Sequence, residues 1–141
     1  MGNDICFNLA MRKSTRLITQ FYERRFKAVD LKAGQFSILR ATYLQRETTN
    51  RDLQGLLVLD QTTLSRNLKP LLRDGYLQVK PNVNDSRVKM ISLTKAGRAL
   101  YKKALPIWAQ AQEDVIERLG VKNAKNVLNI ADVFLDAFSD S

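Results

Sequence analysis

Between residues 60 and 75 the apolar positions repeat with the period of a helix that buries one side. The apolar side consists of Leu64, Leu68, Leu71 and Leu72. Asp60 can cap the first turn, because a carboxylate accepts a hydrogen bond from a free backbone N–H. Gly75 can end the helix in a left-handed conformation. The pattern predicts a helix over this segment, with a bend at Arg66–Pro70, where an interior proline removes a backbone hydrogen bond.

The opposite side of this helix is polar and positively charged. It carries Thr62, Thr63, Arg66, Lys69 and Arg73, with almost no large apolar group. Such donors suit a helix that reads base edges and phosphates in a major groove. The same composition fits the solvated side of an ordinary amphipathic helix, so this helix alone does not decide between the two interpretations.

Three helices are predicted before this segment. The first spans 4–27, with Asp4 as its cap and a stripe made of Phe7, Met11, Leu17, Ile18, Phe21 and Tyr22. The second spans about 34–46 and turns Phe36, Leu39 and Tyr43 inward. The third runs from Arg51 to Leu57, and its buried side comprises Leu53, Leu56 and Leu57. Because only a short turn separates it from the capped, basic helix, the pair indicates a helix-turn-helix.

After Gly75 the period of the apolar positions changes from that of a helix to that of a strand. Residues 76–80 and 88–93 alternate as two strands, and the segment 81–87 between them is rich in turn-forming residues. Lys80, Arg87 and Lys89 surround this predicted hairpin. A basic hairpin beside a recognition helix can enter a minor groove, although most basic loops are simply solvated.

Two further helices are predicted near the C-terminus. Thr94 caps the first, which runs to about Leu119 with a kink at Pro106, and the second spans about 122–138. The last helix places Val127, Ile130, Ala131, Phe134, Leu135 and Phe138 on one face. The long helices carry more apolar surface than the helix-turn-helix can cover, which leaves two explanations open: a helical dimer interface, or an intramolecular helical core.

Composition narrows the possible functions. The chain of 141 residues has 23 Lys and Arg against 14 acidic residues, a formal charge of +9, which favours a polyanionic partner such as nucleic acid or an anionic membrane surface. We find no signal peptide and no apolar run long enough to span a bilayer, so we expect a cytoplasmic protein. With one Cys and no His, we expect no disulfide within the chain, no zinc site and no cofactor. We find no catalytic constellation and expect a protein that is not an enzyme.

Four segments, taken together, resemble the MarR family of winged-helix regulators. They are Asp60-Gln61-Thr62-Thr63-Leu64-Ser65-Arg66-Asn67-Leu68-Lys69-Pro70-Leu71, Asp74-Gly75-Tyr76-Leu77, Asn84-Asp85-Ser86-Arg87 and Leu93-Thr94-Lys95-Ala96-Gly97. The resemblance covers nearly the whole chain. It implies a mainly α fold with a small β-hairpin wing, in which residues 33–97 form a winged helix-turn-helix. Residues 1–32 and 98–141 would intertwine with those of a second copy in a homodimer.

The resemblance also implies a function and a set of DNA-binding residues. Members bind a pseudo-palindromic operator in double-stranded DNA, and many repress transcription until a small phenolic or lipophilic ligand enters the cleft between the dimerisation and DNA-binding regions. Major-groove contacts are expected from Thr62, Thr63, Ser65, Arg66 and Lys69, with Gln61 and Arg73 in the same candidate set. Asp85 would brace the wing, and Arg87 would reach the minor groove.

Cys6 supports an alternative function. Cys6-Phe7 near the start of the first helix resembles the peroxide-sensing branch of the family, in which a cysteine there is oxidised. A helix N-terminus can favour the reactive thiolate. Two departures count against it: Phe36 stands where a Tyr partner is expected, and the chain has no second Cys. An inert thiol is the other interpretation.

Overall fold

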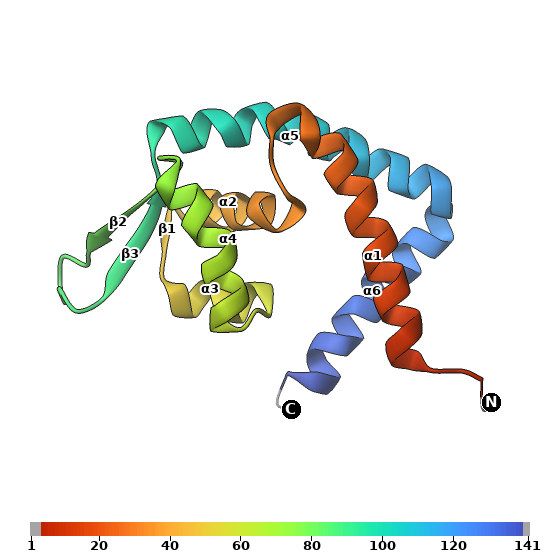
Figure 1. Ribbon diagram of the computed structural model, residues 1–141. Coiled ribbons are helices and arrows are strands. Elements are labelled where there is room, and N and C mark those ends of the chain that lie inside the picture. The colour runs from red at the N-terminus through yellow and green to blue at the C-terminus, as the bar shows by residue number, and fades with distance from the viewer. Residues whose placement is uncertain (1–3, 140–141) are drawn as a thin grey trace.

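The computed structural model describes residues 4–139, and it is dominated by helices (Figure 1). The elements are α1 (Phe7–Phe26), a short 3-10 helix η1 (Lys27–Val29), α2 (Ala33–Gln45), β1 (Glu47–Thr48), α3 (Asn50–Leu57), α4 (Gln61–Arg73), β2 (Leu77–Pro81), β3 (Lys89–Leu93), α5 (Lys95–Leu119) and α6 (Val121–Phe138). In Figure 1, α2, α3, α4 and the sheet form one lobe, while α1 and α6 extend away from it below α5. The predicted fold class is confirmed. The ends of the predicted dimerisation region, 1–3 and 140–141, lie outside the described residues.

The sheet contains the predicted hairpin and one strand that the sequence did not predict. The strand order is β1-β3-β2, and both pairs are antiparallel. Leu77 lies opposite Leu93, and both side chains are buried, so the base of the hairpin belongs to the core. The expected strands are confirmed with their bounds shifted by one residue at three of the four ends. β1 was missed because a two-residue strand is too short to show an alternation.

An aromatic stack joins the lobe to the long helices. The ring of Phe36, in α2, lies 4.7 Å from that of Phe26, 5.7 Å from Tyr101 and 6.1 Å from Trp108, measured between centroids. These partners belong to α1 and α5. Aromatic pairs at such separations add to the stabilisation that their burial already provides. The stack therefore holds α1 and α5 against the lobe formed by α2, α3, α4 and the sheet.

Several predicted details are wrong. α1 begins at Phe7, and its N-cap is Cys6, whose Sγ accepts a hydrogen bond from the N–H of Leu9 at 3.5 Å, so Asp4 does not cap it. Three side chains expected inside are exposed: Tyr43 (39%), Leu56 (56%) and Leu72 (36%). Periodicity gives the direction of a side chain but not how much of it a neighbour covers: the ring of Tyr43 contacts that of Tyr101 in α5, with 4.6 Å between the centroids, and is still partly open to solvent. The helices α4 and α5 continue through Pro70 and Pro106, and the bends expected there stay predictions.

Much of the apolar surface of α1 and α6 is not covered by the chain itself. No residue of α6 is buried, and its exposed large apolar residues are Val121, Val127, Leu128, Ile130, Val133, Phe134, Leu135 and Phe138. On α1 the corresponding residues are Phe7, Leu9, Met11, Leu17 and Ile18. An intramolecular core does not account for these side chains. Among the described residues, no helix is both long and apolar enough to cross a membrane.

The end of α4 is joined directly to the start of α5. The hydroxyl of Thr94 donates to the carbonyl oxygen of Gly75 at 2.5 Å, and its backbone N–H donates to the carbonyl oxygen of Tyr76 at 3.1 Å. The same hydroxyl caps α5 by accepting a hydrogen bond from the N–H of Gly97 at 3.0 Å. A Cβ atom at position 97 would lie only 1.9 Å from the carbonyl oxygen of Tyr76. This junction therefore requires glycine.

We expect Gly97→Ala to destabilise the protein, because the added methyl group forces the two backbones apart at a packed junction. Overpacking of this kind costs about 1–3 kcal/mol, which thermal denaturation would detect as a lower Tm. Gly55→Ala is the matched control, since a Cβ there meets nothing within 4 Å and alanine favours the helix. An equal Tm for the two variants would contradict the close approach.

Candidate nucleic-acid interface

Both ends of α4 are fixed by specific hydrogen bonds. At the start, Oδ1 of Asp60 accepts from the N–H of Thr63 at 2.7 Å. The Thr63 hydrogen bonds hold the pKa of the Asp60 carboxyl below its ordinary value. At the end, Gly75 has φ +79°, its N–H donates to the carbonyl oxygen of Leu72, and the N–H of Tyr76 donates to that of Leu71. These two bonds form a Schellman motif, so the predicted cap and stop are confirmed.

Burial on one side of α4 presents its polar side to solvent. Leu64, Leu68 and Leu71 are 0–5% exposed and belong to the core. The predicted site residues lie around the rest of the helix: Thr62, Arg66 and Lys69 are exposed, as is Gln61, while Thr63 and Ser65 are half-buried. The structure therefore brings six of the seven predicted α4 residues together within the first three turns. Their donors and cations face outward.

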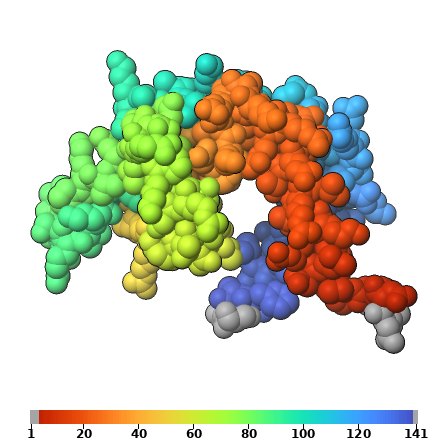
Figure 2. Space-filling model, viewed as in Figure 1, coloured from red at the N-terminus to blue at the C-terminus, as the bar shows by residue number. Residues whose placement is uncertain are grey.

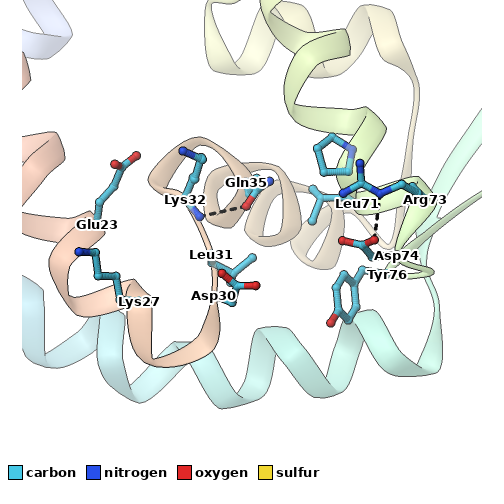
Figure 3. Close-up of a pocket in the computed structure, with 11 residues that line it drawn as sticks. Glu23, Lys27, Asp30, Leu31, Lys32, Gln35, Leu71, Arg73, Asp74 and Tyr76 are labelled. Atoms are coloured by element: carbon cyan, nitrogen blue, oxygen red, sulfur yellow. Dashed lines mark hydrogen bonds and ion pairs between the residues drawn. The ribbon is translucent and has the colours of Figure 1, made fainter.

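Arg73 lies apart from the other six. It is the last residue of α4, roughly 16 Å along the helix axis from Thr62 at about 1.5 Å per residue. Its Nε forms an ion pair with Oδ1 of Asp74 at 3.1 Å. Figure 3 shows this pair beside Tyr76 at a cavity of about 350 Å³, whose other wall comes from the end of α1 and the start of α2. Grouping residues by the face of the helix alone puts Arg73 with the other six, because such a grouping ignores distance along the helix axis.

The turn of the wing holds one arginine toward solvent. The carboxylate of Asp85 accepts hydrogen bonds from the backbone N–H and Nε of Arg87, both at 3.1 Å, and from its Nη2 at 3.2 Å. The side-chain bond to Arg87 is the main cause of the lowered pKa of Asp85. Oδ1 of Asn82 accepts from the N–H groups of Asn84 and Asp85, which closes the turn. The Arg87 side chain remains 90% exposed, so the turn orients a cation without burying it.

A large apolar hollow separates the lobe from α1 and α6. It measures about 1050 Å³ and opens in the middle of the molecule in Figure 2. One wall comes from α1 and α6, with Phe7, Met11, Phe134, Leu135 and Phe138. The other wall is the end of α3 and the turn after it, with Gln54, Gly55, Val58 and Leu59. No pattern in the sequence predicts this second wall, since it depends on how the lobe sits relative to α1 and α6.

Gln54 was also missed as a neighbour of the candidate site. Its Nε2 donates to Oε1 of Gln61 at 2.7 Å, across the turn between α3 and α4. Gln61 in turn donates from Nε2 to Oγ of Ser65 at 3.1 Å. Gln54 and Gln61 lie on two different helices with a turn between them, so the periodicity of either helix does not predict this contact.

Cys6 is exposed and lies at the start of α1. It is the only cysteine of the chain, so it has no partner for an internal disulfide. Phe36, where the resemblance would place a tyrosine, is buried in the aromatic stack and has no hydroxyl. These features do not favour the oxidant-sensing alternative. In the part of the chain that the structure describes, no group of three His, Cys, Asp or Glu residues could hold a metal ion.

The capped basic helix, the preceding α3 and the adjoining hairpin define a winged helix-turn-helix protein. The MarR family profile matches residues 31–89. The transcriptional regulator MOSR of M. tuberculosis, solved in complex with DNA, is 30% identical, covers 95% of this chain and 99% of its own, and superposes with a TM-score of 0.79. The organic hydroperoxide resistance transcriptional regulator of Bacillus subtilis is 30% identical over 76% of this chain and 71% of its own length. The chain belongs to the MarR family.

Two further comparisons limit how far the likeness extends. MarR of E. coli bound to operator DNA has the same fold, with a TM-score of 0.82 and 20% identity over 91% of this chain and 92% of its own. The uncharacterised regulator YybA of B. subtilis is 27% identical over 70% of this chain, and the matched segment spans 65% of the length of YybA.

We expect Asp60→Ala to lower the Tm at neutral pH, because the first turn of α4 loses its cap. The pKa of Asp60 is lowered in the folded state, so its stabilisation is present above the pKa of an unfolded aspartate, about 3.9, and is lost as the pH falls through the folded value. In thermal melts from about pH 7 to about pH 3, the Tm difference between parent and variant should therefore narrow.

Asp60→Asn separates the cap from the charge. Asparagine caps a helix as well as aspartate but does not titrate, so this variant should melt close to the parent at neutral pH. A Tm difference between the parent and Asp60→Ala that stays constant over the whole pH range would contradict the role of the ionised carboxylate.

Proposed function

We propose that the protein is a homodimeric, sequence-specific DNA-binding repressor that a small phenolic or lipophilic effector releases from its operator. One observation carries the proposal: α4 turns hydroxyls and cations outward beside a wing that holds Arg87 toward solvent. We propose that the protein is not an enzyme. We also propose that it is located in the cytoplasm, where it meets its operator.

We assign the contacts according to position on the lobe. Gln61, Thr62, Thr63, Ser65, Arg66 and Lys69 would face the major groove, since they lie together in the N-terminal part of α4, where four of them are exposed and Thr63 and Ser65 are half-buried. Arg87 would enter the minor groove and Asp85 would orient it, as their hydrogen bonds suggest. Arg73 belongs at the edge of this interface, because it is paired with Asp74 at the far end of α4.

The exposed apolar helices support a dimer. Residues 1–32 and 98–141 would form the dimerisation region and residues 33–97 the DNA-binding domain. α1 and α6 leave many large apolar side chains exposed, and monomeric proteins rarely expose so much apolar surface. A twofold dimer would present two copies of α4 to the two halves of a pseudo-palindromic operator.

The hollow between lobe and helices supports an effector of apolar character. Its walls are mainly aliphatic and aromatic, and it lies between the two proposed regions. A ligand held there would contact both regions at once. Only a ligand that prefers one arrangement of the regions over the other can change DNA affinity.

We expect Arg66→Ala to weaken operator binding by roughly 5- to 150-fold, about 1–3 kcal/mol, and to relax the preference for one base pair. The measurement is fluorescence anisotropy with an operator selected from random duplexes, repeated over a range of salt concentrations. The parent's affinity should fall linearly with salt on logarithmic axes. Lys122→Ala removes a positive charge from α6, outside the proposed interface, and should leave the base preference unchanged. Unchanged affinity and preference in Arg66→Ala would contradict the assignment of α4.

We expect the parent to sediment as a dimer of 16.1 kDa chains, and Leu17→Asp to shift it toward monomer. Leu17 is 68% exposed on the apolar side of α1, and a charge there would be buried without a partner in the proposed interface. Gln20→Asp, on the polar side of the same helix, is the control. Analytical ultracentrifugation in which both variants stay dimeric would place the interface elsewhere.

A further inference from the structure

One chain of side-chain hydrogen bonds crosses the turn of the helix-turn-helix. Gln54 Nε2 donates to Oδ1 of Asn50 at 2.6 Å and to Oε1 of Gln61 at 2.7 Å, and Nε2 of Gln61 donates to Oγ of Ser65 at 3.1 Å. Asn50 and Gln54 are one turn apart on α3, and Gln61 and Ser65 are one turn apart on α4. Among the described residues, the bond between Gln54 and Gln61 is the only side-chain hydrogen bond that joins these two helices.

The direction of these bonds fixes the orientation of each amide relative to the next one in the chain of bonds. A glutamine amide has two donor hydrogens on nitrogen and two acceptor lone pairs on oxygen. Nε2 of Gln54 donates one hydrogen to Asn50 and the other to Gln61, so both partners must turn an oxygen toward it. Oε1 of Gln61 therefore points toward α3, and its nitrogen points along α4 toward Ser65.

This orientation determines what Gln61 can offer to another molecule. One lone pair on Oε1 and one hydrogen on Nε2 remain free, with the acceptor on the α3 side and the donor on the Ser65 side. Ser65 accepts from Gln61, so its own hydroxyl hydrogen remains available to donate. A bidentate contact from glutamine to adenine uses one acceptor and one donor in a set order. An exposed glutamine free to rotate would also lose side-chain entropy when it binds.

We propose that Gln54 is a specificity-determining positioning residue, which sets the polarity of the Gln61 amide and so the base that Gln61 reads. The inference rests on the proposed function, since it presupposes that α4 reads DNA. Gln54 acts through Gln61 and reads no base itself. The chain of amides has a second self-consistent polarity, in which every donor and acceptor is exchanged. A side chain at position 54 that can only accept would enforce that reverse polarity.

The experiment selects duplexes from a random-sequence library with the full-length protein and then measures single-base variants of the selected operator. Gln61→Ala identifies the base pair whose preference depends on Gln61. At that base pair, Gln54→Met should reduce discrimination by at least about fivefold, the equivalent of 1 kcal/mol. Preferences elsewhere in the operator should be retained. In the Gln61→Ala background, Gln54→Met should have no further effect, because coupled residues are not additive.

Two more variants sharpen the test. Gln54→Glu offers only acceptors, so it should change which base is preferred at that position, while its negative charge lowers affinity for all duplexes alike. Gln110→Met makes the matched substitution on α5, where Nε2 of Gln110 donates to Asp114, and should leave the base preferences unaltered. Thermal melts of each variant show whether the fold is intact.

Each other result overturns the inference in an identifiable way. If Gln61→Ala alters one base preference and Gln54→Met alters none, the positioning role is wrong while the proposed function stands. If Gln54→Met lowers the Tm and blurs every position equally, or acts equally in the Gln61→Ala background, its role is structural. Retention of the parent's preferred base in Gln54→Glu rules out control of polarity. A parent protein that selects no sequence overturns the inference together with the proposed function.

Discussion

The burial of three leucines on one side of α4 is the constraint on which the rest of the interface depends. Leu64, Leu68 and Leu71 are nearly inaccessible, and each such side chain contributes about 1.5–3 kcal/mol when removed from water. Together they outweigh the roughly 3 kcal/mol that Pro70 costs in a plain helix. A helix of this length is marginal by itself, so tertiary burial holds it. Because the buried side is fixed, so is the side that carries Arg66 and Lys69.

The same core also sets the position of the wing. Leu77 and Leu93 pair at the base of the hairpin and are buried with the leucines of α4. Thr94 ties the end of α4 to the start of α5 through Gly75 and Tyr76, so both strands leave from a fixed point. The outer part of the hairpin extends from the lobe in Figure 1 and relies on its own turn for order. Local bonds at the tip and burial at the base therefore keep Arg87 at a defined place relative to α4.

Sequence periodicity predicted the elements because burial on one side of a helix or strand leaves a repeating record. The bounds of α4, its two caps and the paired strands follow from side chains within a few residues of one another. What failed depends on how far neighbouring elements cover a side chain: Leu56 and Tyr43 remain exposed, although the Tyr43 ring packs against Tyr101 of α5. The assignment of Arg73 to the interface stays a prediction, since Arg73 shares a side with Arg66 but lies at the C-terminal end of α4. Gln54 reaches Gln61 only because the turn folds α3 against α4.

The apolar surface of α6 places a further demand on any assembly. Its large apolar residues include Ile130, Phe134 and Val133, which cover more than half of the circumference when projected together with Leu128 and Val121. A helix that is apolar over so wide an arc is stable in water only between two surfaces. α5 and α1 of the same chain supply contacts on one side at most, since no residue of α6 is buried. In the proposed dimer, the partner must therefore cover the remaining arc.

Because the aromatic stack around Phe36 fixes the lobe to α1 and α5, the way in which two copies of α6 pack would set the distance between the two copies of α4. The two half-sites of an operator lie about one helical turn of DNA apart, so packing far from the DNA would select which operators the dimer can span.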